Sequence, residues 1–217
     1  MFINLTNEEK EDRFEQILSY SQKIKNPILK KVAINILNDK KDKIFKMAAG
    51  NDGIEGRKVR KTHHCYEGGL LDHTLSVTKH AYNIGKLYSS NIDMDLIIFG
   101  AIFHDIGKIE IFDEWNEESE VKANLNFSYL LVDHVYIGQK IVEDYLNKEN
   151  ITDKFKYQVL HMIATHMDTF EKHMIEAHIV SYADSIDAHI QNMINYPRNE
   201  INPLYDQHIY MSENDSV

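Results

Sequence analysis

Apolar residues recur every three to four positions along most of the chain, a pattern that is typical of amphipathic helices. Residues 8–25 form the first such stretch. Asn26 followed by Pro27 is typical of an N-cap with proline in the first helical turn, so we predict a second helix from Pro27 to about Ala49. We therefore expect residues 1–55 to form an N-terminal helical extension that packs on the rest of the protein.

A buried helix is predicted immediately before the pair His104-Asp105. Residues 96–103 (LIIFGAIF) are apolar on every side, which indicates a central position in the fold. Asp93 is suited to cap the N-terminus of this helix. The pattern therefore places two polar, titratable side chains at the end of the most apolar segment of the chain.

The rest of the chain shows the same helical periodicity. The further predicted helices cover residues 70–88, 130–147, 153–167 and 174–194. Residues 113–124 are acidic and weakly patterned, so we predict an exposed loop there, and no segment gives a convincing strand signal. We predict an all-α protein with one helical-bundle domain over residues 56–196 and a polar tail over residues 197–217.

Composition supports long helices in a protein without membrane association. Only 9 glycines and 3 prolines interrupt 217 residues. No apolar run approaches the roughly 18–20 residues that cross a bilayer, and the N-terminus lacks the pattern of a signal peptide. The lone Cys65 cannot form an internal disulfide. We therefore expect a cytoplasmic protein; its oligomeric state stays open.

The charge argues against duplex DNA as a partner. The formal net charge is −10, whereas affinity for a phosphate backbone comes largely from lysine and arginine. A phosphate substrate is still compatible with this charge, because bound cations can be the largest local charges in a site. Histidine is not among the commonest residue types, yet the chain has 12, which suggests that imidazole groups carry a function.

Four metal-ligating side chains occur in apolar helical segments. His73 lies in the 70–88 helix, His104 and Asp105 end the buried helix, and Asp184 lies in the last predicted helix. Two imidazoles and two carboxylates suit Mn, Fe, Zn, Ni or Co better than Ca or Mg. A bundle can assemble such a site from separate helices. The alternative is a buried, hydrogen-bonded His–Asp pair without a metal.

Three motifs give these residues a family context. GGLLDHT (68–74), FHDIGK (103–108) and YADSIDA (182–188) follow one another in this order. Together they resemble the HD-domain superfamily of metal-dependent phosphohydrolases over roughly residues 60–192. The stretches HHCYEGG (63–69) and LHMIATH (160–166) resemble more specifically the HD domain of YhaM-type 3′–5′ exoribonucleases. The resemblance implies an HD-type helical bundle in which His73, His104, Asp105 and Asp184 hold a divalent cation.

The resemblance also raises the question of a second ion. In HD enzymes with two metals, histidines between the HD pair and the last aspartate bind the second one, and the aspartate of the pair bridges. His134 and His166 are the preferred ligands here, with His161 as a further candidate. His161 and His166 lie about 140° apart on a regular helix, so they share one ion only if the helix ends between them. Alternatively, these histidines contact substrate phosphate or orient the ligands.

Several residues are candidates for the reaction itself. Asp105 would hold the metal that activates the attacking water, and Asp187, one turn after Asp184, would orient a ligand or water. Lys108 and His64 are candidates for binding phosphate. Arg57 and Arg60, in the basic loop 57–61, would form an electropositive approach to the site, although such a loop can equally be a plain solvated segment.

The resulting prediction is a metal-dependent phosphohydrolase that cleaves a phosphoester of a nucleotide or short oligonucleotide. Two features separate this chain from the exoribonucleases. Those enzymes usually carry a strand-rich OB domain, whereas residues 1–55 are predicted to be helical, and Met167 replaces a histidine that follows the position of His166. The alternatives are a 5′-nucleotidase and a non-catalytic regulatory protein that binds a nucleotide.

Overall fold

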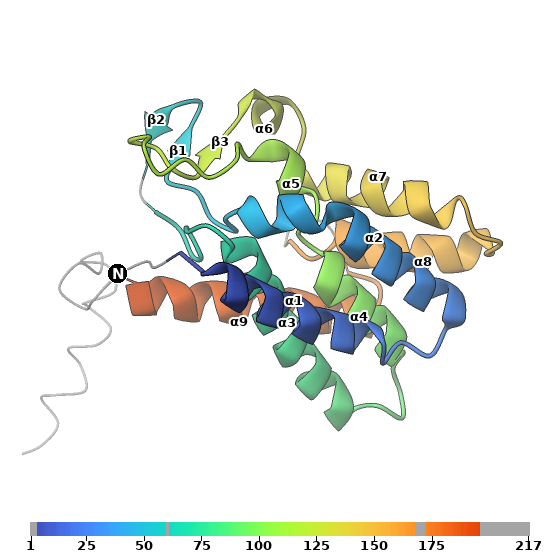
Figure 1. The fold of residues 1–217 in the computed structure, drawn as a ribbon. Coiled ribbons are helices and arrows are strands. Elements are labelled where there is room, and N and C mark those ends of the chain that lie inside the picture. The colour runs from blue at the N-terminus through green and yellow to red at the C-terminus, as the bar shows by residue number, and fades with distance from the viewer. Residues whose placement is uncertain (1–3, 60, 168–171, 196–217) are drawn as a thin grey trace, which may run out of the picture.

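Helices form most of the fold. The computed structural model describes residues 4–59, 61–167 and 172–195. The helices are α1 (Asn7–Ser21), α2 (Pro27–Lys46), α3 (Gly69–Leu87), α4 (Met94–Phe103), α5 (Lys108–Ile111), α6 (Phe127–Leu131), α7 (His134–Leu146), α8 (Asp153–Ala164) and α9 (Ile175–Asn195). The strands are β1 (Gly53–Ile54), β2 (Arg57–Lys58) and β3 (Asn124–Leu125). The predicted all-α class is thus confirmed, with one very small sheet added (Figure 1).

Helix α4 lies at the centre of the bundle. Every residue from Leu96 to Phe103 is buried, and α3, α8 and α9 all pack against this helix. Asp93 caps its N-terminus by accepting hydrogen bonds from the backbone N–H groups of residues 95 and 96. The predicted central helix is therefore confirmed, and it delivers His104 and Asp105 into the interior.

The N-terminal helices share this core. Thr6 and Glu9 form a reciprocal capping box at the start of α1, and Asn26 caps α2 as predicted. Phe14 of α1 and Ile36 of α2 are almost completely buried within the same hydrophobic cluster as α4. Helix α1 packs along α3, so the N-terminal segment contacts the helix that carries His73.

A three-stranded sheet at one end of the molecule corrects the expectation of no strands (Figure 1). β1 pairs antiparallel with β2, with Gly53 opposite Lys58, and parallel with β3, with Gly53 opposite Asn124. Segment 113–124, predicted as an exposed loop, also buries Val121 and Ala123. Strands of two residues are too short for an alternating pattern, and the β1–β3 pairing joins segments that are far apart in the sequence.

Several helix bounds differ from those predicted. Helix α2 ends at Lys46, α8 ends at Ala164, and the predicted helix 130–147 is divided into α6 and α7. Asp133 causes the division, because its side chain accepts a hydrogen bond from the Val135 N–H and so caps α7. His134 therefore lies at the N-terminus of α7. His166 lies beyond the C-terminus of α8.

Within the described residues, no helix combines the length and the apolar character that a membrane crossing requires.

Candidate metal centre

The first group of candidate ligands converges from three helices. His73 comes from α3, His104 and Asp105 follow α4, and Asp184 comes from α9. The His73 Nε2 atom lies 3.1 Å from His104 Nε2, 3.1 Å from Asp184 Oδ1 and 3.3 Å from Asp105 Oδ2. Both imidazole side chains are completely buried. The four residues predicted from the sequence are thus brought together at one point.

The hydrogen bonds of the two rings leave lone pairs facing each other. His73 Nδ1 donates to Asp187 Oδ2 at 2.7 Å, and His104 Nδ1 donates to the Ala101 carbonyl at 2.9 Å. A neutral imidazole has one N–H, so both Nε2 atoms are acceptors. In this tautomer they face each other and carboxylate oxygens, an arrangement that a proton or a metal cation between them stabilises. Ligands at 2.0–2.2 Å from one ion lie about 3 to 3.5 Å apart, as these atoms do.

The pKa of His73 leads to the same conclusion. Burial acts to lower it, but hydrogen bonds with Asp105, Asp184 and Asp187 outweigh burial and raise the pKa well above its ordinary value. The position therefore favours a positive charge on or beside the ring. A divalent cation supplies that charge and competes with the proton for Nε2.

A second group of donors lies on the other side of Asp105. His134 Nε2 and His166 Nε2 are 3.3 Å apart, and they lie 3.3 and 3.5 Å from Asp105 Oδ1. Each ring again uses Nδ1 elsewhere. His134 Nδ1 lies 2.9 Å from Asp133 Oδ1, and His166 Nδ1 donates to the Ile163 carbonyl at 2.7 Å. This group has the same lone-pair arrangement as the first.

Asp105 connects the two groups. Its Oδ2 faces His73 and its Oδ1 faces His134 and His166, so the carboxylate offers one oxygen to each group. Lys108 Nζ lies 2.6 Å from Oδ2. Burial alone would raise the pKa of Asp105, but Lys108 and the surrounding histidines hold it well below its usual range. The carboxylate is therefore ionised, as a metal ligand must be.

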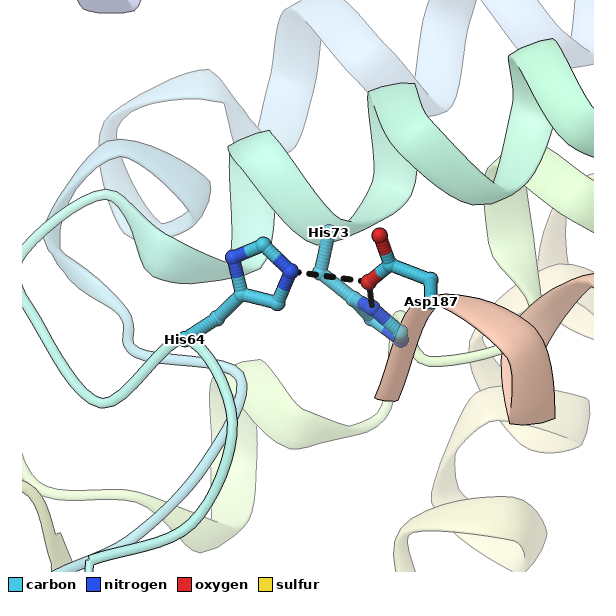
Figure 2. A group of neighbouring side chains, drawn as sticks. All are labelled: His64, His73 and Asp187. Atoms are coloured by element: carbon cyan, nitrogen blue, oxygen red, sulfur yellow. Dashed lines mark hydrogen bonds and ion pairs between the residues drawn. The ribbon is translucent and has the colours of Figure 1, made fainter. Parts of the chain in front are cut away.

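A hydrogen-bond network at the Nδ1 side of the His73 ring fixes its orientation (Figure 2). Asp187 Oδ2 accepts from His73 Nδ1 and, at 2.8 Å, from His64 Nε2. The other nitrogen of His64 is 2.8 Å from the Tyr66 hydroxyl, which in turn lies 2.9 Å from Asp72 Oδ2. Burial would raise the pKa of Asp187, yet the two imidazoles lower it strongly. A carboxylate that fixes the tautomer of a metal-binding histidine is a recurring feature of metal sites.

The same network corrects the predicted role of His64 as a phosphate contact, whereas Asp187 makes the orienting contact expected of it. His64 is 2% exposed and both of its ring nitrogens have protein partners, so it is not free to contact a phosphate. Its backbone φ of 47° lies in the left-handed region, where few residues other than glycine are found. A Cβ on Gly69 would meet the His64 carbonyl oxygen at 2.0 Å, so the motif glycine makes this close packing feasible. Asp187 orients His73 and is not itself placed among the first four donors.

Other predicted residues lie outside the two groups. His161 is on α8, and its Nε2 accepts a hydrogen bond from the His173 backbone N–H at 3.2 Å. Because α8 ends between His161 and His166, only His166 turns toward Asp105. Arg57 is exposed on β2 in the small sheet, and Arg60 lies outside the described residues. Burial and Asp52 raise the pKa of the Cys65 thiol to about 12, which rules it out as a nucleophile at neutral pH.

Two side chains at the centre were not identified from the sequence. One is Asp133, whose carboxylate orients His134. If the predicted helix had begun at residue 134, Asp133 would have stood in the N-cap position, where aspartate is common. His63 is the other: its ring centre lies 5.1 Å from that of His73. His63 and His64 are adjacent in the sequence, and no sequence signal indicates which of them faces the centre.

Gly107 explains a further position of the FHDIGK motif. A Cβ at this residue would lie 1.9 Å from the His134 carbonyl oxygen and 2.6 Å from the Gly138 nitrogen. Both atoms belong to the α7 backbone, which cannot move aside as a flexible side chain can. Gly107 therefore sets how closely the HD pair approaches the helix that carries His134.

We predict that Gly107→Ala destabilises the protein by about 1–3 kcal/mol, because α7 must shift. Thermal unfolding followed by circular dichroism would show a melting temperature lower by several degrees. Gly85→Ala is the matched control: its Cβ would meet the ends of the Met94 and Ile97 side chains at 2.9 and 3.0 Å, which can adjust. Equal melting temperatures for the two variants would contradict this account.

Comparisons with known proteins agree with the geometry. A family model described as HD domain matches residues 70–189. The dihydroneopterin 2′,3′-cyclic phosphate phosphodiesterase of Methanocaldococcus jannaschii is 28% identical over 190 residues, which cover 82% of this chain and 70% of that protein. The 3′-5′ exoribonuclease YhaM of a Geobacillus species is 26% identical over 223 residues, which cover 99% of this chain. No solved structure shows a significant match.

The extent of these matches differs. The chain spans 64% of the exoribonuclease's own length, and that alignment includes the N-terminal helices as well as the bundle. The family model begins at residue 70, after His63 and His64, and its range contains both groups of donors that meet at Asp105. Because it matches more than half of the chain, the chain belongs to the HD domain family.

Proposed function

We propose that this protein is a metal-dependent phosphodiesterase that hydrolyses a phosphoester of a nucleotide or short oligonucleotide. The observation that carries the proposal is the orientation of Asp105, whose two oxygens face two separate groups of buried imidazoles. Two ions a short distance apart are a recurrent arrangement in enzymes that cleave phosphate esters. The two relatives described above, a cyclic phosphate phosphodiesterase and an exoribonuclease, are both named for phosphodiester cleavage.

The side chains divide into ligands and supports. His73, His104, Asp105 and Asp184 would hold one divalent cation, and Asp105, His134 and His166 a second, of the Mn, Fe, Co, Ni or Zn class. When bound, such cations activate water and stabilise negative charge on phosphorus oxygens. Asp187 and His64 would keep His73 Nε2 oriented toward a bound cation, and Asp133 would do the same for His134.

We expect Lys108 to contact the substrate in addition to forming its ion pair with Asp105. Its amine is 2.6 Å from Asp105 Oδ2 and its side chain is 12% exposed, so it lies between the centre and solvent. A phosphate oxygen that approaches the ions from this side meets an ammonium group that is already fixed by an ion pair. Arg57 is exposed on β2, and we expect it to act on the approach of an anion.

A substrate screen tests the proposal. The purified protein is loaded with Mn²⁺ and assayed with bis-p-nitrophenyl phosphate, 2′,3′-cyclic nucleotides, short single-stranded RNA and nucleoside monophosphates. We expect turnover of the diesters, its loss on addition of EDTA, and its recovery with excess Mn²⁺. Phosphate release from the monophosphates alone would indicate a nucleotidase instead. Nucleotide binding without any turnover would identify a regulatory protein.

A further inference from the structure

His63 has a buried polar atom without a partner. Its Nε2 is the one buried side-chain nitrogen or oxygen that lacks a hydrogen bond among residues 4–59, 61–167 and 172–195. Leaving such a group unpaired costs free energy, because the hydrogen bonds to water are lost on burial and nothing replaces them. An unsatisfied atom of this kind calls for an explanation, such as a missing ligand.

The surroundings of His63 place it beside the first group of ligands. Its ring centre is 5.1 Å from the His73 ring, and the charged groups that act on it most strongly are Lys108, His73 and Asp105. The part of the chain that the structure describes contains three groups of donor atoms within 4.8 Å of one another, and His63 joins none of them. It therefore lies next to the metal ligands but outside their coordination distance.

The unpaired ring nitrogen of His63 is suited to a hydrogen bond with an anion. A neutral imidazole carries one N–H and can donate it without adding a further charge to the centre. Cations at the site and the Lys108 ammonium would attract an anionic group to this same region.

We propose that His63 Nε2 donates a hydrogen bond to a phosphoryl oxygen of the bound substrate, next to Lys108. The inference rests on the proposed function, since it assumes a phosphate ester at the centre. It assigns a substrate contact to the residue beside His64, whose own ring is occupied by Asp187 and Tyr66. It also extends the site to a residue outside the segment that the family model matches.

The test uses inorganic phosphate as the probe and does not depend on turnover. Isothermal titration of the Mn²⁺-loaded protein gives the Kd of phosphate for the wild type, His63→Leu and His63→Gln. We expect His63→Leu to raise this Kd about tenfold or more, as the loss of a hydrogen bond to a charged group does. His63→Gln should restore part of the affinity, because its amide can donate. His178→Gln, at an exposed ring on α9, is the control.

Two further measurements separate a substrate contact from other roles. Metal content after desalting should be unchanged in both His63 variants; a loss of metal would make His63 a ligand and overturn the proposal. The metal-free melting temperature of His63→Leu should equal or exceed that of the wild type, because an unpaired buried group is removed. A lower melting temperature with unchanged phosphate affinity would assign His63 a purely structural role.

The outcomes also separate this inference from the proposed function. If the wild type binds phosphate through His63 but cleaves no ester, the contact stands and the phosphodiesterase proposal fails. If the wild type cleaves diesters but phosphate affinity and KM are the same in His63→Leu, the phosphodiesterase proposal stands and the contact is refuted. Absence of phosphate binding by the metal-loaded wild type also refutes the contact.

Discussion

Replacement of Asp105 by alanine should abolish hydrolysis and remove both bound cations while the helical fold persists. The carboxylate offers one oxygen to each group of imidazoles, so its loss removes a ligand from both ions at once. We expect kcat/KM to fall by on the order of 1,000-fold or more, since changes that only perturb the orientation of a ligand already cost 10–100-fold. Metal analysis and a diesterase assay on the same sample would measure both effects.

The control for this variant is a carboxylate that has no part in the centre. Asp144 is exposed on α7, and Asp144→Asn should keep the metal content and the activity of the wild type. Circular dichroism of Asp105→Ala should retain the helical signal, because α4 and the helices around it are held by the hydrophobic core. Wild-type turnover in Asp105→Ala would refute the proposed mechanism.

Removal of the second group of ligands should have a different signature. We expect His134→Ala to lower the bound metal from two ions to one and to reduce diester turnover by about 100-fold. His73, His104, Asp105 and Asp184 remain in this variant, so one ion is retained. Metal content per protein by mass spectrometry, together with kcat, would distinguish this outcome from the loss of both ions expected for Asp105→Ala.

His161→Ala provides the matched comparison. His161 and His166 come from the same short motif, but His161 accepts its hydrogen bond from the His173 backbone and lies outside the group that contains His134. We expect His161→Ala to keep both ions. Loss of an ion in His161→Ala, with both ions kept in His166→Ala, would identify His161 as the ligand. That result would contradict the assignment of His166, which is based on the end of α8 at Ala164.

The helical class, the buried α4 and the first four candidate ligands could all be predicted from the chain alone. Each of these rests on a local pattern. Eight consecutive apolar or glycine residues at 96–103 can only be accommodated in the interior, and the side chains that directly follow them must lie at the end of a buried helix. The motifs around His73, His104 and Asp184 then indicated the order in which separate helices supply ligands.

The arrangement of these residues around Asp105 depends on how the helices pack in three dimensions. Whether His134 and His166 face Asp105 depends on where α7 begins and where α8 ends, and periodicity does not locate such ends within one or two residues. The contacts of Asp187 with His64 and His73 join positions 123 and 114 residues apart, and they exist because α9 packs along α3. Such contacts follow from packing between helices, which no local pattern in the chain encodes.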